Sequence, residues 1–283
     1  MKNNTQNFSK KFWWGPHFVA VLFFKKMKMK NNKRGQVTIF IIIALLLVVI
    51  ALFVFLFYPK LKTGASLSAD SPQVYMRNCV KPTLEDSVEK ISLQGGSLEP
   101  EFFYEYLGEK LNYLCYTNDY YEFCVSQITF LRAHVEEEIT KAVQTEVDEC
   151  FDSLIQNYQS QGYTVDSKKG TLITELLPGR ILIHLQGFEI STEKGGESKK
   201  YSSFSLTLNN NLYQFIDLAN KITEDEATKG FSDNNAYMGM YVGLKLPKIE
   251  RTDGTTIYII EDQETKQKFQ FAIRNLVIPP GYN

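Results

Sequence analysis

The stretch from Val37 to Tyr58 reads VTIFIIIALLLVVIALFVFLFY, and it decides the architecture that the sequence predicts. It has 22 residues, no charged side chain, and only Thr38 and Tyr58 as polar ones. As a helix it would be about 33 Å long at about 1.5 Å per residue, enough to cross a hydrocarbon core of about 30 Å. A buried core helix seldom stays apolar on every face over such a length. The stretch therefore predicts one transmembrane helix.

The charges are distributed unevenly on the two sides of this stretch. All 32 acidic residues lie after residue 58, whereas nine of the 31 basic residues precede residue 37. The chain from residue 37 onward therefore has 22 basic and 32 acidic residues, a net charge of −10. Cytoplasmic flanks of membrane helices are enriched in Lys and Arg. We therefore expect residues 1–36 to be a basic cytoplasmic leader and residues 59–283 to lie outside the cell. The acidic exterior argues against a nucleic-acid partner.

A shorter apolar segment, from Phe12 to Phe24, precedes the predicted membrane helix. Its 13 residues are interrupted by Gly15 and Pro16, and they are too few to span a membrane. The segment either lies in the inner membrane interface, where tryptophan is favoured, or is not translated. In the second case the chain starts at Met27 or Met29, which leaves the compact basic lead-in of a signal sequence. Both alternatives stay open.

The residues just before the apolar stretch carry a family resemblance. The run from Lys33 to Phe40, KRGQVTIF, places a basic pair, a glycine and a glutamine directly before the apolar helix. This order resembles the class III signal of archaeal type IV pilin-like proteins and, more loosely, archaeal single-pass surface proteins of unknown function. The resemblance implies cleavage by a prepilin-type peptidase between Gly35 and Gln36. It also implies filament assembly, although Phe40 stands where pilins carry a glutamate.

Residues 71–283 predict an extracytoplasmic α+β domain that follows a short polar linker at 59–70. Apolar residues recur every three or four positions in helical segments and every second position in strands. Because these segments are segregated, we expect two or three helices packed on antiparallel β-hairpins or a β-meander. The predicted helices are 71–91 with a kink at Pro82, 125–159 and 210–223; the predicted strands are 180–186 and 201–208, joined through Gly195-Gly196, then 241–249, 255–261 and 266–275.

Four cysteines lie in the predicted exterior, and an even number of cysteines in an oxidising compartment suggests two disulfides. Sequence alone allows three pairings. We favour Cys79 with Cys150, which would join two helices, and Cys115 with Cys124, which would close an aromatic loop. In the chain-entropy view these bonds would stabilise the fold by about 4 and about 3 kcal/mol. Free buried thiols are the alternative, and a metal site is disfavoured because no CxxC motif occurs.

Aromatic residues are concentrated between Pro100 and Cys124. Exposed rings of this kind stack on sugars or pack against a protein partner, so they form a candidate partner surface. The alternative is that they pack the base of an irregular loop. The candidate residues are Phe102, Phe103, Tyr104, Tyr106, Tyr116, Tyr120 and Tyr121.

The sequence contains no motif typical of catalysis or cofactor binding, whether HExxH, GxSxG, GxxxxGK[ST] or GxGxxG. His134 heads an acidic run on a predicted helix and His184 lies in a predicted strand; we expect both to be ordinary surface or interface residues. Two calcium-like runs, at Asp233 and Asp253, do not continue the EF-hand loop pattern and are expected to be turns. We expect no metal, no cofactor and no enzyme activity.

Together these observations predict a single-pass, membrane-anchored cell-surface protein with a structural, adhesive or complex-forming role. Its partners would be the membrane, through Val37 to Tyr58, and other surface or pilus-like subunits. The second hypothesis is a pilin-like filament subunit processed between Gly35 and Gln36. The third is a membrane-tethered extracytoplasmic enzyme without a recognisable motif.

Overall fold

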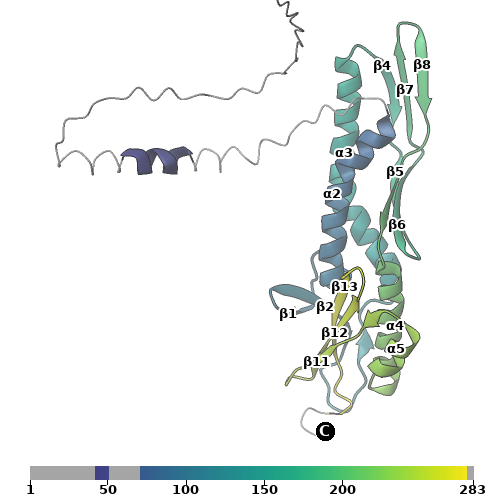
Figure 1. Ribbon diagram of the computed structural model, residues 1–283. Coiled ribbons are helices and arrows are strands. Elements are labelled where there is room, and N and C mark those ends of the chain that lie inside the picture. The colour runs from purple at the N-terminus through teal and green to yellow at the C-terminus, as the bar shows by residue number, and fades with distance from the viewer. Residues whose placement is uncertain (1–41, 51–70, 279–283) are drawn as a thin grey trace, which may run out of the picture. The chain divides into compact units, whose positions relative to one another are not determined.

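The structure is a computed structural model that describes residues 42–50 and 71–278 (Figure 1). The chain separates into two compact units, Met1–Ala65 and Ser66–Asn283. In the first unit, residues 42–50 form a helix with exposed side chains. The second unit is α+β and contains helices α2 to α5 and strands β1 to β13.

The predicted fold class is wrong in two respects. Among the described residues, no helix is long and apolar enough to cross a membrane. The nine helical residues at 42–50 would cover only about 14 Å of a core of about 30 Å, and the flanks at 37–41 and 51–58, like the leader and the linker, lie outside the described residues. The sheets also differ from the prediction. The described part has thirteen strands in three sheets, where the sequence predicts five strands.

Two long helices, α2 (Pro72–Leu93) and α3 (Leu131–Ser160), pack against each other. Each buries a stripe with the three- and four-residue spacing of one helix face. Pro82 does not end α2, because Pro82 and Asn78, whose carbonyl loses its helical partner, are both exposed to solvent. The buried stripes are Met76, Val80, Leu84, Val88 and Ile91 in α2, and Leu131, Val135, Ile139, Val143, Val147, Cys150, Leu154 and Tyr158 in α3.

The helix predicted from Val125 begins only at Leu131. Cys124 is held by a disulfide to Cys115. The next two residues form β3 (Val125–Ser126), which pairs with the end of β2 (Glu109–Tyr116). Covalent bonding and strand pairing thus override the helical period of this segment.

A three-stranded meander runs beside α3, and each of its strands is broken near the middle. One half consists of β4 (Thr164–Lys168), β7 (Glu189–Lys194) and β8 (Glu197–Tyr201), and the other of β5 (Thr171–Leu177), β6 (Arg180–Gln186) and β9 (Ser205–Asn209). Figure 1 shows the two halves following one another along the unit. The predicted turn at Gly195-Gly196 joins β7 to β8.

Gly170 explains one of these breaks. Its φ is +82°, and a Cβ at this position would lie 2.3 Å from the carbonyl oxygen of Gln186. Only glycine allows both the left-handed backbone and this close approach of two strands. The segment from 164 to 177, for which the sequence predicts no strand, is therefore divided into β4 and β5.

At the other end of the unit, a seven-stranded sheet has the order β1-β2-β13-β12-β10, with β11 paired to β12 and β3 to β2. Strands β2 and β13 run parallel, so the sheet is mixed and not the antiparallel meander that the sequence predicts. The aromatic segment forms a hairpin here and not an irregular loop. The strands not yet defined are β1 (Phe103–Tyr106), β10 (Leu244–Lys245), β11 (Lys248–Glu250), β12 (Thr255–Asp262) and β13 (Lys268–Arg274).

The remaining helices are α4 (Leu212–Lys229) and the short α5 (Asn234–Met240). The first of these ends at Gly230, whose φ of +81° gives the left-handed C-cap that glycine favours. The strand predicted at 241–249 is instead β10 and β11, because Pro247 between them cannot donate a ladder hydrogen bond.

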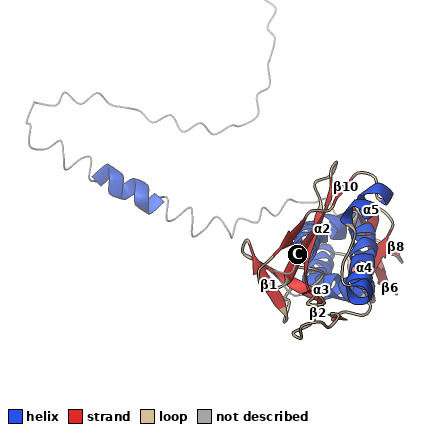
Figure 2. Ribbon diagram, turned by 90° about the horizontal axis from the view of Figure 1, so that it is seen from below, coloured by secondary structure: helices blue, strands red, loops and turns tan. Residues whose placement is uncertain are grey.

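The core lies between helices and sheets. Figure 2 shows α2, α3 and α4 between strands β1 and β2 on one side and β6 and β8 on the other. On β13, Phe269, Phe271 and Ile273 are buried against the helices, as their alternation with polar residues predicts. The opposite face of this sheet carries a second, smaller cluster to which only strands contribute: Leu111, Tyr113, Ile257 and Ala272.

Candidate functional site

Two disulfides staple the second unit, and the described residues contain no free cysteine. Cys79 on α2 is bonded to Cys150 on α3, with Cα atoms 6.0 Å apart. Cys115 on β2 is bonded to Cys124, with Cα atoms 5.4 Å apart. The prediction of disulfides is confirmed, and the bonded pairs are those that the sequence favours.

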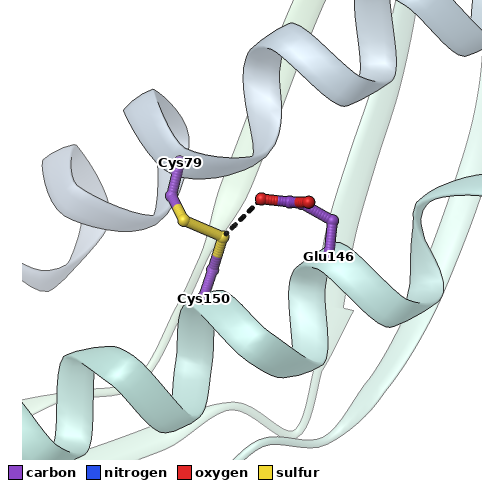
Figure 3. A group of neighbouring side chains, drawn as sticks. All are labelled: Cys79, Glu146 and Cys150. Carbon is purple, nitrogen blue, oxygen red and sulfur yellow. Dashed lines mark hydrogen bonds between the residues drawn. A yellow bond between two sulfur atoms is a disulfide. The ribbon is translucent and has the colours of Figure 1, made fainter. Parts of the chain in front are cut away.

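One carboxylate lies beside the first disulfide. Oε1 of Glu146, one helical turn before Cys150, is 3.6 Å from Sγ of Cys150 (Figure 3). The dashed contact would be a hydrogen bond only with the thiol of a reduced chain, because a disulfide sulfur has no proton to donate. Ligand atoms of Cys79, Cys150 and Glu146 lie within 4.8 Å of one another. Since thiolates and not disulfides bind metals, this group would become a metal site only after reduction.

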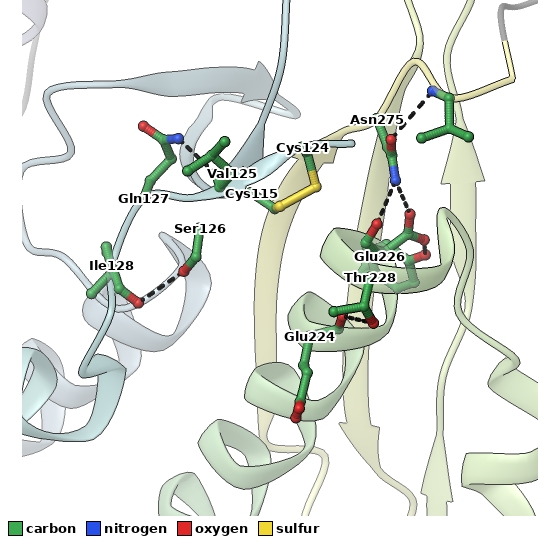
Figure 4. The surroundings of a disulfide bond; sticks show 12 residues. Cys115, Cys124, Val125, Ser126, Gln127, Ile128, Glu224, Glu226, Thr228 and Asn275 are labelled. Atoms are coloured by element: carbon green, nitrogen blue, oxygen red, sulfur yellow. Dashed lines mark hydrogen bonds between the residues drawn. A yellow bond between two sulfur atoms is a disulfide. The ribbon is translucent and has the colours of Figure 1, made fainter. Parts of the chain in front are cut away.

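The second disulfide lies next to a buried carboxyl group (Figure 4). Asn275 Nδ2 donates to the Glu226 backbone oxygen at 2.7 Å and to its Oε2 at 3.1 Å, and the Tyr258 hydroxyl donates to Oε1. Glu226 is only 6% exposed. Burial raises its pKa above the usual value of a glutamate, against the opposing effect of these neutral donors. The network ties α4 to β12 and to the segment that follows β13.

The predicted aromatic surface is divided by the fold. Ala272 pairs with Tyr113 and Ile273 with Cys115, so β2 has a bulge that skips Leu114. The bulge turns Cys115 inward to its disulfide and places Tyr113 and Tyr116 on the same outer side of the sheet. We call this side the aromatic face and define it by Phe102, Tyr104, Tyr106, Tyr113 and Tyr116.

Rings on the aromatic face contact one another, and Tyr116 lies edge to face with both Phe102 and Tyr113. The Phe102 ring centroid lies 4.9 Å from that of Tyr113 and 4.6 Å from that of Tyr116, and the last two are 5.0 Å apart. Tyr113 is buried below the others, which raises the pKa of its hydroxyl, and it bonds to Thr255 at 3.0 Å. Phe102 is 42% exposed. The face is therefore a preformed layer of rings.

Two arginines complete the aromatic face, and sequence reasoning missed both. Arg251 Nε donates to the Tyr104 hydroxyl at 3.0 Å. Arg274 donates to the Tyr116 hydroxyl at 2.9 Å, with its guanidinium carbon 5.4 Å from the ring centroid. The alternation along β13 places Arg274 outside, but only the tertiary fold brings Arg251 to Tyr104.

The hairpin between β1 and β2 ends in an unusual turn. Tyr106 pairs with Glu109, and the two residues between them, Leu107 and Gly108, have φ of +52° and +89°. Two positive φ values are typical of a type I′ hairpin turn, which favours Asn or Asp at the first position. Here a leucine adopts the left-handed conformation while it is 86% exposed. The hairpin thus presents a strained, solvent-facing apolar side chain next to the aromatic face.

Three of the predicted surface residues are not part of this face. Phe103 lies on the other side of β1, where the Lys110 ammonium is 4.8 Å from its ring centroid. Tyr120 and Tyr121 are 61% and 70% exposed in the loop closed by the second disulfide. The backbone N–H of Tyr121 donates to the Leu276 carbonyl at 2.8 Å, which attaches this loop to the segment just after β13.

His134 belongs to a polar network that would be missed without the structure. Its Nε2 is 2.8 Å from Ser97 Oγ, and Asn112 donates to the same oxygen at 2.9 Å. The serine oxygen accepts from Asn112 and has a further lone pair and a proton, so either Ser97 or His134 can donate in the bond between them, according to the tautomer of the ring. This Ser–His pair is incomplete as a triad, since no carboxylate among the described residues bonds to the other ring nitrogen. Ser97 is also buried, so the network links the turn at Gly95-Gly96 after α2 to β2 and α3.

The other predicted polar features take local structural positions. Asp233 caps α5 by accepting from Asn235 N at 3.0 Å, and Asp253 accepts from Thr255 N at 3.0 Å. His184 lies on β6, half-buried, with no described hydrogen-bond partner for Nδ1. The acidic run on α3 is partly used internally, since Glu136 accepts from Leu176 N at 2.9 Å. The predicted cleavage site at Gly35 and Gln36 lies outside the described residues.

Comparison with known proteins finds no matching family model, no similar curated protein and no similar solved structure.

Proposed function

We propose that the second unit is a non-catalytic, extracytoplasmic domain that forms a complex with a partner protein through the aromatic face. The observation that carries this proposal is a layer of rings and two arginines, with Phe102 and Arg251 exposed and the others half-buried or buried, on a sheet face whose cluster receives residues from strands only. Tyrosine, phenylalanine and arginine are enriched at the centres of protein interfaces, where they contribute most of the binding energy.

The arginines indicate the chemistry of the partner. Among the described residues, neither Arg251 nor Arg274 has a carboxylate within 4.0 Å. Both guanidiniums are held by neutral acceptors, Arg251 by a tyrosine hydroxyl and Arg274 by a tyrosine hydroxyl, the Asn118 side-chain oxygen and the Asp253 carbonyl. These contacts position the guanidiniums but leave their charges unpaired. A partner surface that presents carboxylates between apolar side chains would pair these charges and cover the rings. The partner we propose is therefore a protein with such an acidic and apolar surface.

The disulfides support a location outside the cytoplasm. Structural disulfides persist in oxidising compartments and are rare in the cytosol. All four cysteines of the chain are paired in the structure. A surface role of this kind corresponds to the structural, adhesive or complex-forming function that the sequence predicts.

Site-specific photocrosslinking of the full-length protein in the cells that make it would test the proposal. A photoreactive phenylalanine analogue replaces Leu107, beside the aromatic face, and in a control it replaces Lys199 on β8, at the far end of the unit. We expect a specific adduct from position 107 whose crosslinked partner peptide contains Asp or Glu. The exposed substitution Arg251→Glu should reduce this adduct at least tenfold, whereas Lys199→Glu, the same charge change elsewhere, should not.

Equal crosslinking from positions 107 and 199, or an adduct insensitive to Arg251→Glu, would contradict the proposal. A crosslink to a second copy of the chain that obeys the same charge dependence would support it and identify the partner as the chain itself. Thermal unfolding of each variant ensures that a lost adduct reflects a lost contact.

A further inference from the structure

A separate cleft of about 660 Å³ lies away from the aromatic face. It is bordered by the C-terminal half of α2, the junction of β9 and α4, and the turn between β12 and β13. Its size is in the range of small-molecule and saccharide sites, about 300 to 1,000 Å³. Its polar lining is dominated by carboxamides and hydroxyls: Asn209, Asn210, Gln267, Gln270, Ser92 and Thr265.

The rim of this cleft is held in place by hydrogen bonds. Asn211, the residue before α4, donates its backbone N–H to Gln267 Oε1 and its side-chain amide to Asp262 Oδ2, both at 3.0 Å. Asp262 also accepts from the N–H groups of Glu264 and Thr265, which lowers the pKa of its carboxyl. The turn is thereby attached to α4, so the carboxamides are displayed on a preorganised wall.

Much of the hydrogen-bonding capacity in the cleft is unused. Within the described residues, the side chains of Asn209 and Gln270 make no hydrogen bond. Asn210 and Gln267 use only their oxygens, to Leu212 N at 2.8 Å and to Asn211 N at 3.0 Å, so their NH₂ groups are free to donate. Carboxamides that offer both donors and acceptors match ligands whose groups do the same.

The charges of the cleft balance. Glu85 and Glu89 stand on the α2 side, and Lys266 and Lys268 on the turn side. Glu89 and Lys266 have no ion-pair partner within 4.0 Å in the described part. The other two charges are paired, Glu85 with Lys81 at 3.5 Å and Lys268 with Glu261 at 3.3 Å. With one unpaired charge of each sign, the lining favours a polar ligand without net charge that makes charge-assisted hydrogen bonds at both walls.

Part of the cleft lining is apolar. Leu93 and Leu208 are partly exposed there, whereas Val88 and Phe215 are almost fully buried. A saccharide ring combines these requirements, because it carries hydroxyls that donate and accept around its rim and C–H groups on its faces. We propose that this cleft binds a neutral saccharide.

An extended peptide fits less well. Peptides commonly add a strand to a free sheet edge, and the N-terminal half of β13 has no partner on its β2 side within the described pairings. Gly95 closes that edge, since a Cβ there would lie only 3.2 Å from the Gln270 carbonyl oxygen and 2.9 Å from Asn112 Cβ. No space is left for another strand.

A glycan array carrying neutral and acidic oligosaccharides, probed with the full-length protein, would test the proposal. The variants Gln270→Leu and Asn209→Leu remove two carboxamides from the cleft. Gln156→Leu on α3 is the matched control, because it removes an exposed carboxamide outside the cleft. We expect binding of neutral oligosaccharides that falls at least about tenfold in both cleft variants and is unchanged in the control.

Absence of binding to every neutral glycan, selective binding of acidic glycans, or equal binding by the cleft and control variants would overturn the proposal. If Gln270→Leu lowers the unfolding temperature, the exposed substitution Glu89→Gln gives the same test without a change in packing. Arg251→Glu on the aromatic face should leave glycan binding unchanged, so the two proposed surfaces can fail independently.

Discussion

Tyr258 of β12 donates a hydrogen bond to the carboxyl group of Glu226, which α4 buries beside Asn275. Within the described residues, no Lys, Arg or His lies within 4.0 Å of this carboxyl group. Burial therefore dominates and raises the pKa of Glu226. Burial and the neighbouring carboxyl also raise the pKa of Tyr258, which keeps its hydroxyl protonated as a donor.

The raised pKa of Glu226 makes the stability of the domain depend on pH. The folded state holds this proton more tightly than the unfolded state does, so the stabilising contribution is complete below the unfolded pKa near 4.5 and is lost as pH rises through the folded value. Glu226→Gln cannot titrate. In urea unfolding from pH 4 to pH 8, we expect the free energy of unfolding of the wild type, relative to this variant, to fall as pH rises.

Asp225, the neighbouring residue, provides a control of opposite sign. Burial acts to raise the pKa of Asp225, but hydrogen bonds from Lys229 and Tyr237 outweigh it and lower this pKa. Its contribution is present above the unfolded pKa of 3.8 and is lost as pH falls through the folded value. The difference between wild type and Asp225→Asn should therefore change only at the acidic end. Parallel pH profiles for wild type and Glu226→Gln would contradict the first prediction.

Replacement of Leu107 by asparagine should stabilise the domain while weakening its proposed interaction. Leu107 has a positive φ, which costs a branched side chain about 1 kcal/mol and asparagine much less. We expect Leu107→Asn to raise the free energy of unfolding by up to about 1 kcal/mol, measured in urea. Gly108→Ala, at φ +89°, should act in the opposite direction. A destabilised Leu107→Asn variant would show that Leu107 packs within the domain.

Glu146 should slow the reduction of the disulfide beside it. Its carboxylate is 3.6 Å from Cys150 Sγ, and a nearby negative charge disfavours the thiolate that must leave when the bond is reduced. We expect Glu146→Gln to accelerate reduction of Cys79–Cys150 severalfold under dithiothreitol, followed by thiol alkylation and peptide mapping. The Cys115–Cys124 bond in the same molecules is the internal control, and its rate should not change.

Helices were the more predictable part of this fold. Leu84, Val88 and Ile91 of α2 are buried, as helical periodicity predicts. Val74, which the same periodicity places on the buried stripe, is 51% exposed, and Met76 and Val80 are buried instead. The sequence from Val125 onward has a helical pattern, but the Cys115–Cys124 bond holds its beginning beside β2, where it pairs as a strand. The predicted start of α3 is therefore six residues too early. Strands were undercounted because β1 to β5 and β7 pair with partners that no local pattern identifies. Gly170 and Gly187, both at φ +82°, further divide the strands of the meander.

The candidate site was only partly predictable. Aromatic density between Pro100 and Cys124 predicts that rings such as Phe102 and Tyr104 gather in this segment, but not the side of the sheet on which each lies, and their role as a partner surface stays a prediction. The bulge at Leu114 reverses the alternation along β2 and brings Tyr113 next to Tyr116. The saccharide cleft combines residues from α2, the start of α4 and the β12–β13 turn, and no spacing along the chain signals such a convergence.

Processing of the N-terminus is the last prediction, and it concerns residues outside the described part of the chain. If the resemblance to archaeal pilin-like signals holds, the mature protein from native cells begins at Gln36, as mass spectrometry of its N-terminal peptide would show. Gly35→Leu should block cleavage and retain the basic leader, whereas Asn31→Leu, which lies upstream of the site and after all three candidate start residues, should not. A mature chain that begins at Met1, Met27 or Met29 would contradict the filament hypothesis, because assembly in this family follows removal of the leader. In that case the protein would bind its partner through the aromatic face while it still carries its basic leader.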